Sequence, residues 1–113
     1  MASVARKSLI SGAKTATVTG SSIALESGTS AFIGWINVSV CHAATTVTGK
    51  IQHSPDNSSW KDLASFAAIA GTTGTEAIQI TSNVFPYIRG VATLAGATQA
   101  ATVEISFYYD KQR

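Results

Sequence analysis

From Thr15 onward, apolar and polar residues alternate in short runs that are separated by turn-forming residues. The clearest run covers residues 32–41. One face of this strand would carry Phe32, Gly34, Ile36, Val38 and Val40, and the other would carry Ile33, Trp35, Asn37, Ser39 and Cys41. We expect the first face to lie in the core. The second face is partly apolar at Ile33 and Trp35, and we expect another sheet or subunit to cover it.

About eight such runs follow one another, and no stretch keeps a helical period for longer than a turn or two. Gly, Pro, Asn and Ser/Thr clusters separate the runs at fairly regular spacing. This pattern predicts an all-β fold, an antiparallel β-sandwich of jelly-roll-like type with about eight short strands and no significant helix. Residues 14–113 are expected to form this single domain.

Residues 1–13 show no clean period and carry Arg6 and Lys7 beside an apolar pair, Leu9 and Ile10. One interpretation is a frayed terminus. The other is an arm that is poorly ordered alone and docks on a neighbouring subunit, with the basic residues steering it and the apolar pair anchoring it. We adopt the arm as the hypothesis. It makes Arg6, Lys7, Leu9 and Ile10 candidate partner contacts, together with Ile33 and Trp35.

Residues 51–63 predict a strand, a tight turn and a returning strand. Pro55 fixes its own φ, and the side-chain oxygens of Asp56, Asn57 and Ser58 can accept hydrogen bonds from backbone N–H groups in the turn. Trp60 follows the turn and has a large apolar side chain, which we expect the rest of the sheet to cover.

Charged residues make up only 12% of the 113 residues, about half the usual share of roughly 25%, and the net charge is +2. Ser, Thr, Ala and Gly replace the missing charge. A neutral surface of this kind suits a subunit that is covered by others in an assembly. The longest uncharged run, 27–49, alternates and contains Asn37, His42 and many Ser/Thr, so no membrane segment is expected.

The residues suggest no catalytic, metal or cofactor site. If residues 36–42 and 46–53 pair as a hairpin about Ala44 and Thr45, then Cys41, His42 and His53 would not converge on one ion. No Gly-x-Ser-x-Gly elbow and no grouping of His with acid occurs in the sequence, so an enzyme is not expected. The basic residues are few and scattered, which argues against nucleic-acid binding.

Two stretches together resemble small β-sandwich virion proteins of tailed bacteriophages. Residues 51–63 are similar to their "Q-x-S-x-D-G-x-x-W-x-D-L" hairpin, with Asn57 where the usual turn has Gly. Residues 86–96, followed by 102–109, are similar to their closing "Y-[VI]-R … G … V-x-[VI]-x-[FY]" hairpin. The likeness covers roughly residues 30–110.

This resemblance implies a structural protein of the virion, most specifically a capsid decoration (cement) subunit. It would be made in the host cytoplasm, sit on the capsid surface, and contact the major capsid protein and copies of itself, with a trimer as the first expectation. A neck or tail component of the same virion class is the other role that the resemblance allows. The turn is also similar to the "S-x-D-G-x-x-W" turn of discoidin-like carbohydrate-binding sandwiches, so a glycan-binding module is the alternative.

Overall fold

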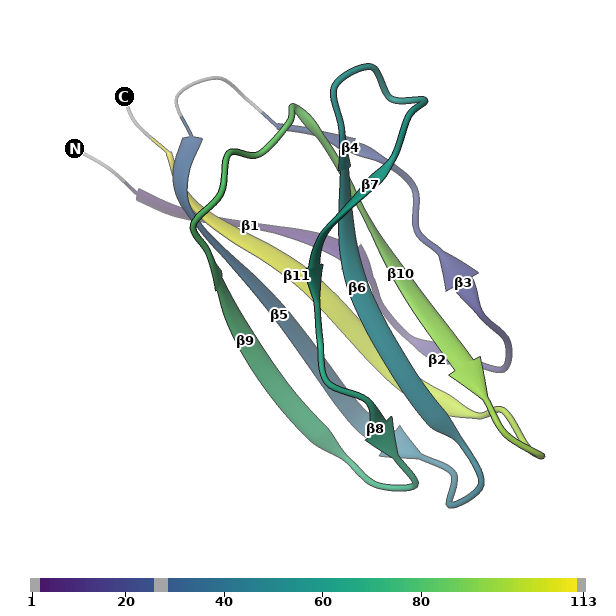
Figure 1. The fold of residues 1–113 in the computed structure, drawn as a ribbon. Coiled ribbons are helices and arrows are strands. Elements are labelled where there is room, and N and C mark those ends of the chain that lie inside the picture. Colours follow the sequence, from purple (N-terminus) through teal and green to yellow (C-terminus); the bar gives the residue numbers. More distant parts are fainter. Residues whose placement is uncertain (1–2, 26–28, 112–113) are drawn as a thin grey trace.

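The computed structural model describes residues 3–25 and 29–111, and these residues form two antiparallel sheets that pack face to face (Figure 1). This confirms the predicted β-sandwich. The strands in chain order are β1 (Ser3–Ile10), β2 (Ala13–Lys14), β3 (Val18–Thr19), β4 (Ile23–Ala24), β5 (Thr29–Cys41), β6 (Thr46–Ser54), β7 (Lys61–Ser65), β8 (Ile69–Ala70), β9 (Gly74–Ile80), β10 (Tyr87–Ala95) and β11 (Ala101–Lys111).

We name the sheets A and B. Sheet A has the order β1-β11-β5-β9, and β2 extends it by pairing with β11. Sheet B has the order β3-β10-β6-β7, with β4 pairing with β10 and β8 pairing with β6. The chain stays within one sheet over β1–β2, over β3–β4 and over β6–β8, and it passes from one sheet to the other at every remaining connection. This alternation is the connectivity of a jelly roll.

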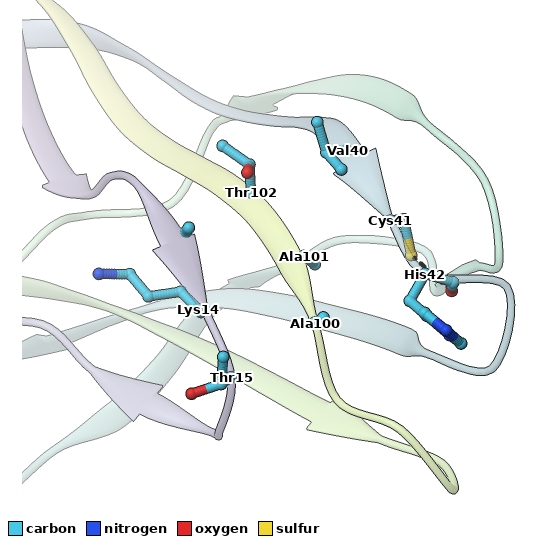
Figure 2. Close-up of a pocket in the computed structure, with 9 residues that line it drawn as sticks. Lys14, Thr15, Val40, Cys41, His42, Ala100, Ala101 and Thr102 are labelled. Atoms are coloured by element: carbon cyan, nitrogen blue, oxygen red, sulfur yellow. Dashed lines mark hydrogen bonds between the residues drawn. The ribbon is translucent and has the colours of Figure 1, made fainter.

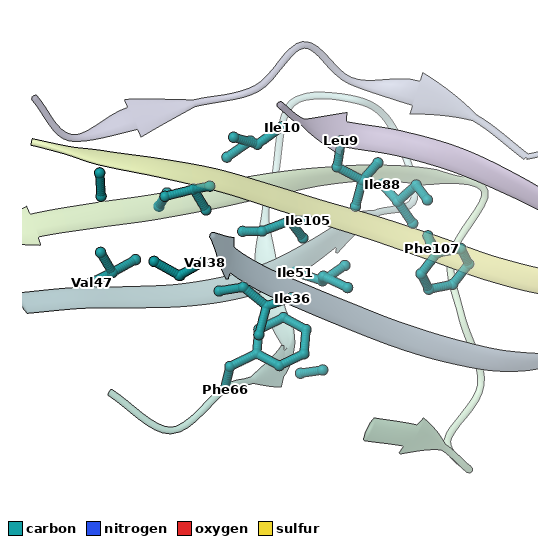
Figure 3. Packing of buried hydrophobic residues seen from close by; sticks show 14 of the residues in the cluster. Leu9, Ile10, Ile36, Val38, Val47, Ile51, Phe66, Ile88, Ile105 and Phe107 are labelled. Carbon is teal, nitrogen blue, oxygen red and sulfur yellow. The ribbon is translucent and has the colours of Figure 1, made fainter. Parts of the chain in front are cut away.

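The core lies between the inner faces of the two sheets (Figure 3). Inward-facing residues alternate along most of the longer strands, as the sequence pattern predicts, with interruptions where a strand shifts register. The largest completely buried apolar side chains come from both sheets: Ile36, Val38, Val103, Ile105 and Phe107 from sheet A, and Val47, Ile51 and Ile88 from sheet B. Phe107 also stacks on Phe32, with ring centroids 5.3 Å apart.

Two core-facing glycines let the large side chains of the opposite sheet approach the backbone. A Cβ atom on Gly49 of β6 would lie 2.5 Å from Cδ1 of Ile36, which belongs to sheet A. A Cβ atom on Gly34 of β5 would lie 2.8 Å from Cδ1 of Ile51, which belongs to sheet B. A side chain at either position would force the tip of the opposite isoleucine to move, so each isoleucine now fills the space above a glycine across the sandwich.

The predicted N-terminal arm is wrong for residues 3–10, which form β1. This strand pairs with β11 over its length, from Ser3 opposite Lys111 to Ile10 opposite Ile105. Leu9 and Ile10 are 5% and 4% exposed and belong to the core. The periodicity is hard to see because a register shift between Ser8 and Ile10 turns both Leu9 and Ile10 inward. Residues 1–2 lie outside the described residues.

The supposed hairpin of residues 36–42 and 46–53 does not exist either, because β5 lies in sheet A and β6 in sheet B. The link 42–45 crosses between the sheets. The same holds for the closing hairpin expected from residues 86–96 and 102–109, since β10 and β11 lie in different sheets. In both cases two strands with alternating apolar and polar residues flank a turn. This local pattern does not distinguish a hairpin from a connection that leads to the opposite sheet.

Thr45, in the link between β5 and β6, forms hydrogen bonds to two other loops. Its hydroxyl donates to the carbonyl oxygen of Thr98 at 2.6 Å and accepts from the N–H of Ala100 at 3.0 Å. Its own carbonyl oxygen accepts from the N–H of Gly71 at 2.8 Å. Thr45 is 1% exposed, and these bonds satisfy polar groups that would otherwise be buried without partners.

The position of β1 yields the first prediction. Leu9→Ala and Ile10→Ala should each lower the free energy of unfolding by about 2–5 kcal/mol, because each change leaves a cavity between the sheets. The exposed neighbour Ser8 provides the control: Ser8→Ala should change stability by less than about 0.5 kcal/mol. Urea denaturation measures all three. Near-parent stability of both core variants would mean that this segment does not belong to the sandwich.

Candidate interaction surfaces

The hairpin between β6 and β7 is closed by side-chain bonds to its own backbone. Oδ1 of Asp56 accepts from the N–H groups of Ser58 and Ser59, at 2.9 and 2.8 Å. Ser54, which is buried, donates its hydroxyl to Asp56 Oδ1 at 3.0 Å and accepts from the Asp56 N–H at 3.2 Å. These bonds lower the pKa of the Asp56 carboxyl, the N–H of Ser59 contributing most and that of Ser58 next.

Asn57 has a φ of 62°, in the left-handed region. Glycine adopts this conformation at least cost, and asparagine tolerates it better than most other residues. Asn57 therefore holds a conformation that a glycine would also adopt at this position. Pro55 is exposed beside it and takes no part in the core.

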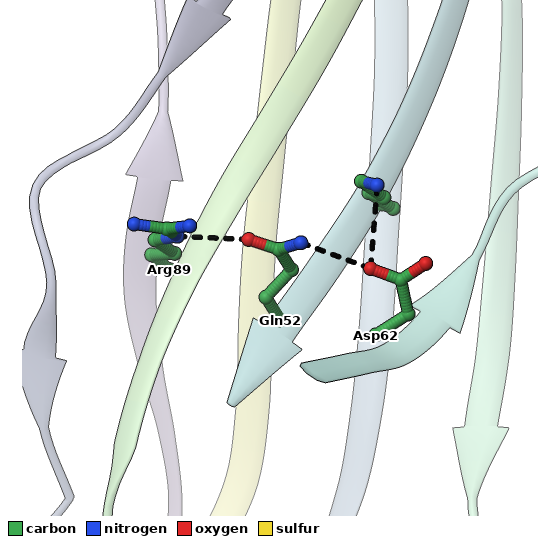
Figure 4. Close-up of polar contacts among 4 residues, drawn as sticks. Gln52, Asp62 and Arg89 are labelled. Carbon is green, nitrogen blue, oxygen red and sulfur yellow. Dashed lines mark hydrogen bonds and ion pairs between the residues drawn. The ribbon is translucent and has the colours of Figure 1, made fainter. Parts of the chain in front are cut away.

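A line of polar side chains crosses the outer face of sheet B (Figure 4). Nε of Arg89 on β10 donates to Oε1 of Gln52 on β6 at 2.8 Å. Nε2 of Gln52 donates to Oδ1 of Asp62 on β7 at 2.9 Å, and Nζ of Lys50 lies 3.3 Å from the same oxygen. The bond from Gln52, followed by that from Lys50, lowers the pKa of Asp62. We call Lys50, Gln52, Asp62 and Arg89 the polar ladder.

Trp60 belongs to this face and not to the core. The guanidinium carbon of Arg89 lies 4.2 Å from the centroid of the Trp60 ring, a cation–π contact. Trp60 is only half-buried, so the expectation that the sheet closes over it is wrong. Its ring stacks on the arginine at one end of the polar ladder. The two stretches that carry the family resemblance meet here, since Gln52, Trp60 and Asp62 come from one and Arg89 from the other.

The outer face of sheet A is different in character. Ile33 on β5 is 41% exposed, and Tyr108 of β11 lies opposite it in register. Trp35 follows two residues along β5, between Ser106 of β11 and Ala77 of β9. We name Ile33, Trp35, Ala77 and Tyr108 the sheet A patch. The sequence pattern placed Ile33 and Trp35 on this face but missed Tyr108 and Ala77, which only the strand register brings beside them.

Arg6 borders the sheet A patch from β1. It forms an ion pair with Glu104, with Nη2 and Oε2 2.8 Å apart, and its Nε donates to the buried hydroxyl of Ser106 at 3.2 Å. Lys7 points to the other side of β1 and is half-buried opposite Phe107. Of the four residues proposed for an arm, the structure thus puts Leu9 and Ile10 in the core and only Arg6 on the outer face of sheet A.

A shallow hollow of about 310 Å³ lies at the end of sheet A where β5 ends and β11 begins (Figure 2). Its lining includes Lys14, Val40, Cys41 and His42, and the rest is alanine and threonine. Val40 is 61% exposed, although its alternation predicted the core. The register shift between Thr102 and Val103 in the pairing with β5 explains this difference.

The chemistry-bearing residues do not assemble into a centre within residues 3–25 and 29–111. No three His, Cys, Asp or Glu side chains of this region come together at metal-binding distances. Cys41 and His42 lie where β5 ends, whereas His53 lies near the opposite end of the sandwich, where β6 ends. This region also holds no helix long and apolar enough to cross a membrane.

Comparisons with known proteins bear on the fold. No protein-family model matches the chain, and no curated protein matches its sequence. The chain is similar to one in the structure of the infectious bursal disease virus Gx strain, with a TM-score of 0.66 and 12% identity over 98% of this chain and 33% of that one. It is also similar to a chain in the crystal structure of the T13 viral particle of that virus, with a TM-score of 0.67 and 8% identity over 98% and 31%.

The chain thus spans about a third of the length of the chains that it matches. At these identities the likeness is one of fold. The resemblance to tailed-bacteriophage proteins stays a prediction.

The contact between Trp60 and Arg89 can be measured by a double-mutant cycle. Trp60→Ala should destabilise the fold by roughly 1–2 kcal/mol, because only part of its surface leaves water. Arg89→Ala in the parent and in the Trp60→Ala background should reveal a coupling of about 0.5–1 kcal/mol. A coupling near zero in urea denaturation would show that the stacking does not contribute to stability.

Asp56 should give the protein a specific sensitivity to acid. Because its pKa is lowered in the fold, the carboxylate contributes stability that is present above its ordinary pKa of 3.8 and lost as pH falls through the lowered value. Asp56→Asn should remove this contribution and flatten the acid limb of stability against pH. Urea midpoints between pH 2 and 6 provide the measurement. An unchanged acid limb in the variant would exclude Asp56 as its source.

Proposed function

We propose that this chain is a structural protein of a virus particle and acts through contacts with other proteins. The observation that carries the proposal is the jelly-roll connectivity of the chain. Over 98% of its length the chain is similar in fold to chains of an icosahedral virus. Jelly rolls are typical of viral capsid domains, although lectin domains use them too. Fold alone does not determine function, so the surface has to support the choice.

The surface supports an assembly role. Only 12% of the residues are charged, which is low for a protein that stays dispersed through its own surface charge. The sheet A patch places Ile33, Trp35 and Tyr108 next to one another on a sheet face. Ile33 is exposed, and Trp35 and Tyr108 are half-buried. Apolar and aromatic side chains that stay accessible on a surface in this way are enriched where proteins bind one another.

In its most specific form, the proposal is a capsid decoration subunit of a tailed bacteriophage, as the motif resemblance implies. The sheet A patch would then face a copy of the chain or the major capsid protein on the outer capsid surface. A closed homo-oligomer, with a trimer as first expectation, would cover the patch on every copy. A neck or tail component would use the same patch against a different neighbour.

A glycan-binding module is the second candidate. It is favoured by the position of Trp60 on an outer face beside the amide of Gln52 and the carboxylate of Asp62. These polar groups already bond one another, and Arg89 covers one face of the ring. A sugar would have to displace these contacts, which makes the second candidate weaker. Glycan-array binding that Trp60→Ala abolishes and Ile33→Lys leaves intact would favour it.

The proposal is tested with particles that lack this protein. Ile33→Lys should weaken attachment of the purified protein by roughly tenfold or more, because it puts a charge where apolar surface would be buried. Thr48→Lys is the matched control, since Thr48 is an exposed residue of β6 on the outer face of sheet B. It should bind like the parent. Both variants should keep the parent's melting temperature within a few degrees.

Attachment is measured by co-sedimentation with the particles, and sedimentation velocity of the free protein gives its oligomeric state. Equal attachment of parent and Ile33→Lys would exclude the sheet A patch as the contact surface. Failure of the folded parent to attach to any particle fraction would contradict the virion role itself.

A further inference from the structure

His53 and Phe85 form a contact that the proposed function does not use. Nδ1 of His53 accepts a hydrogen bond from the backbone N–H of Phe85 at 3.1 Å. The two rings lie against each other, with centroids 4.6 Å apart and planes tilted by 37°. Because Nδ1 is the acceptor, the ring proton of neutral His53 resides on Nε2.

This contact holds the segment that crosses from sheet A to sheet B. Residues 81–86 link the end of β9 to the start of β10. Val84 packs against the core, and the carbonyl oxygen of Pro86 accepts from the N–H of Leu25 at 2.7 Å. Phe85, between them, is 42% exposed and rests on His53. The histidine thus joins an exposed aromatic residue of the crossover to the end of β6.

We propose that His53 is a pH-sensitive latch for residues 81–86. Protonation of Nδ1 by solvent converts this nitrogen from an acceptor into a donor, so that two N–H groups then face each other and the bond to Phe85 is lost. The Phe85 ring and its segment are released from the end of β6. The latch is independent of the proposed function.

The surroundings of His53 contain little charge to oppose this change. In register, Ile88 of β10 lies on one side and Lys61 of β7 on the other. The loop contributes Phe85, which carries no charge. Lys61 is exposed, so solvent screens its effect on the imidazole. The one resolved influence is burial, which lowers the pKa of His53 from its ordinary 6.5 because it disfavours the charged ring.

The direction of the pH effect follows from this shift. The unfolded chain binds the proton more readily than the fold does, so the latch contributes fully above pH 6.5. Its contribution is lost as pH falls through the lowered pKa of the folded state. Mild acid is therefore the condition in which the latch opens.

NMR of the full chain tests the latch between pH 7.5 and 5. The Phe85 amide shift should follow the titration of the His53 ring, and the protection of this amide from solvent exchange should fall by roughly three- to tenfold once His53 is charged. His53→Asn places an amide oxygen near the position of Nδ1 and does not titrate. In this variant, the protection of Phe85, corrected for the intrinsic exchange rate, should stay constant across the range.

His42→Asn is the matched control, because Nδ1 of His42 also accepts a backbone N–H, that of Ala44 at 3.0 Å, near the other end of the sandwich. It should leave the response of Phe85 intact. If His53→Asn does not fold, His53→Gln serves in its place. Constant protection of Phe85 in the parent while His53 titrates would overturn the proposal, as would a pH response of Phe85 that survives in the non-titrating variant.

Discussion

The fit of isoleucine side chains over glycines between the two sheets is the constraint on which the rest of this structure depends. Ile36 of sheet A occupies the space above Gly49 of sheet B, and Ile51 of sheet B occupies the space above Gly34 of sheet A. This reciprocal fit sets the register in which the sheets face each other. A shift of one residue in β6 would place Lys50 or Gln52 where Ile51 now lies. A shift in β5 would place Trp35 or Asn37 where Ile36 now lies. Because successive side chains of a strand point to opposite faces, the residues between these inward-facing positions lie on the two outer faces.

The outer faces of the two sheets differ in how far their side chains already find partners within the chain. On sheet B, Arg89, Gln52 and Asp62 bond one another, and Trp60 lies over the arginine. These polar side chains therefore have hydrogen-bond partners within the chain. On sheet A, Ile33 keeps 41% of its surface exposed beside Trp35, where a partner would remove apolar area from water. The proposed contact surface therefore lies on sheet A, while the motif residues of the family resemblance mainly build sheet B.

Alternation in the sequence was enough to predict the sandwich and much of the inner face of β5, including Ile36 and Val38. It failed where a strand shifts register. Val40 is exposed beyond one such shift, and Leu9 and Ile10 both turn inward at another, so β1 resembled an arm. The β6–β7 hairpin was predicted, but the other strand partners were beyond reach, because most partners in a jelly roll are distant in sequence. The ladder from Arg89 to Gln52 joins residues 37 positions apart, and nothing local to either residue indicates the other.

The central claim is that the chain is a virion component whose outer face on sheet A is covered by a neighbouring protein. A cryo-EM reconstruction of particles that contain the protein tests this most directly. The account predicts density for the jelly roll on the particle, with Ile33, Trp35 and Tyr108 against a neighbouring subunit. A particle in which the chain is present but the sheet A patch faces solvent would contradict the assigned surface, and purified particles without the chain would contradict the account as a whole.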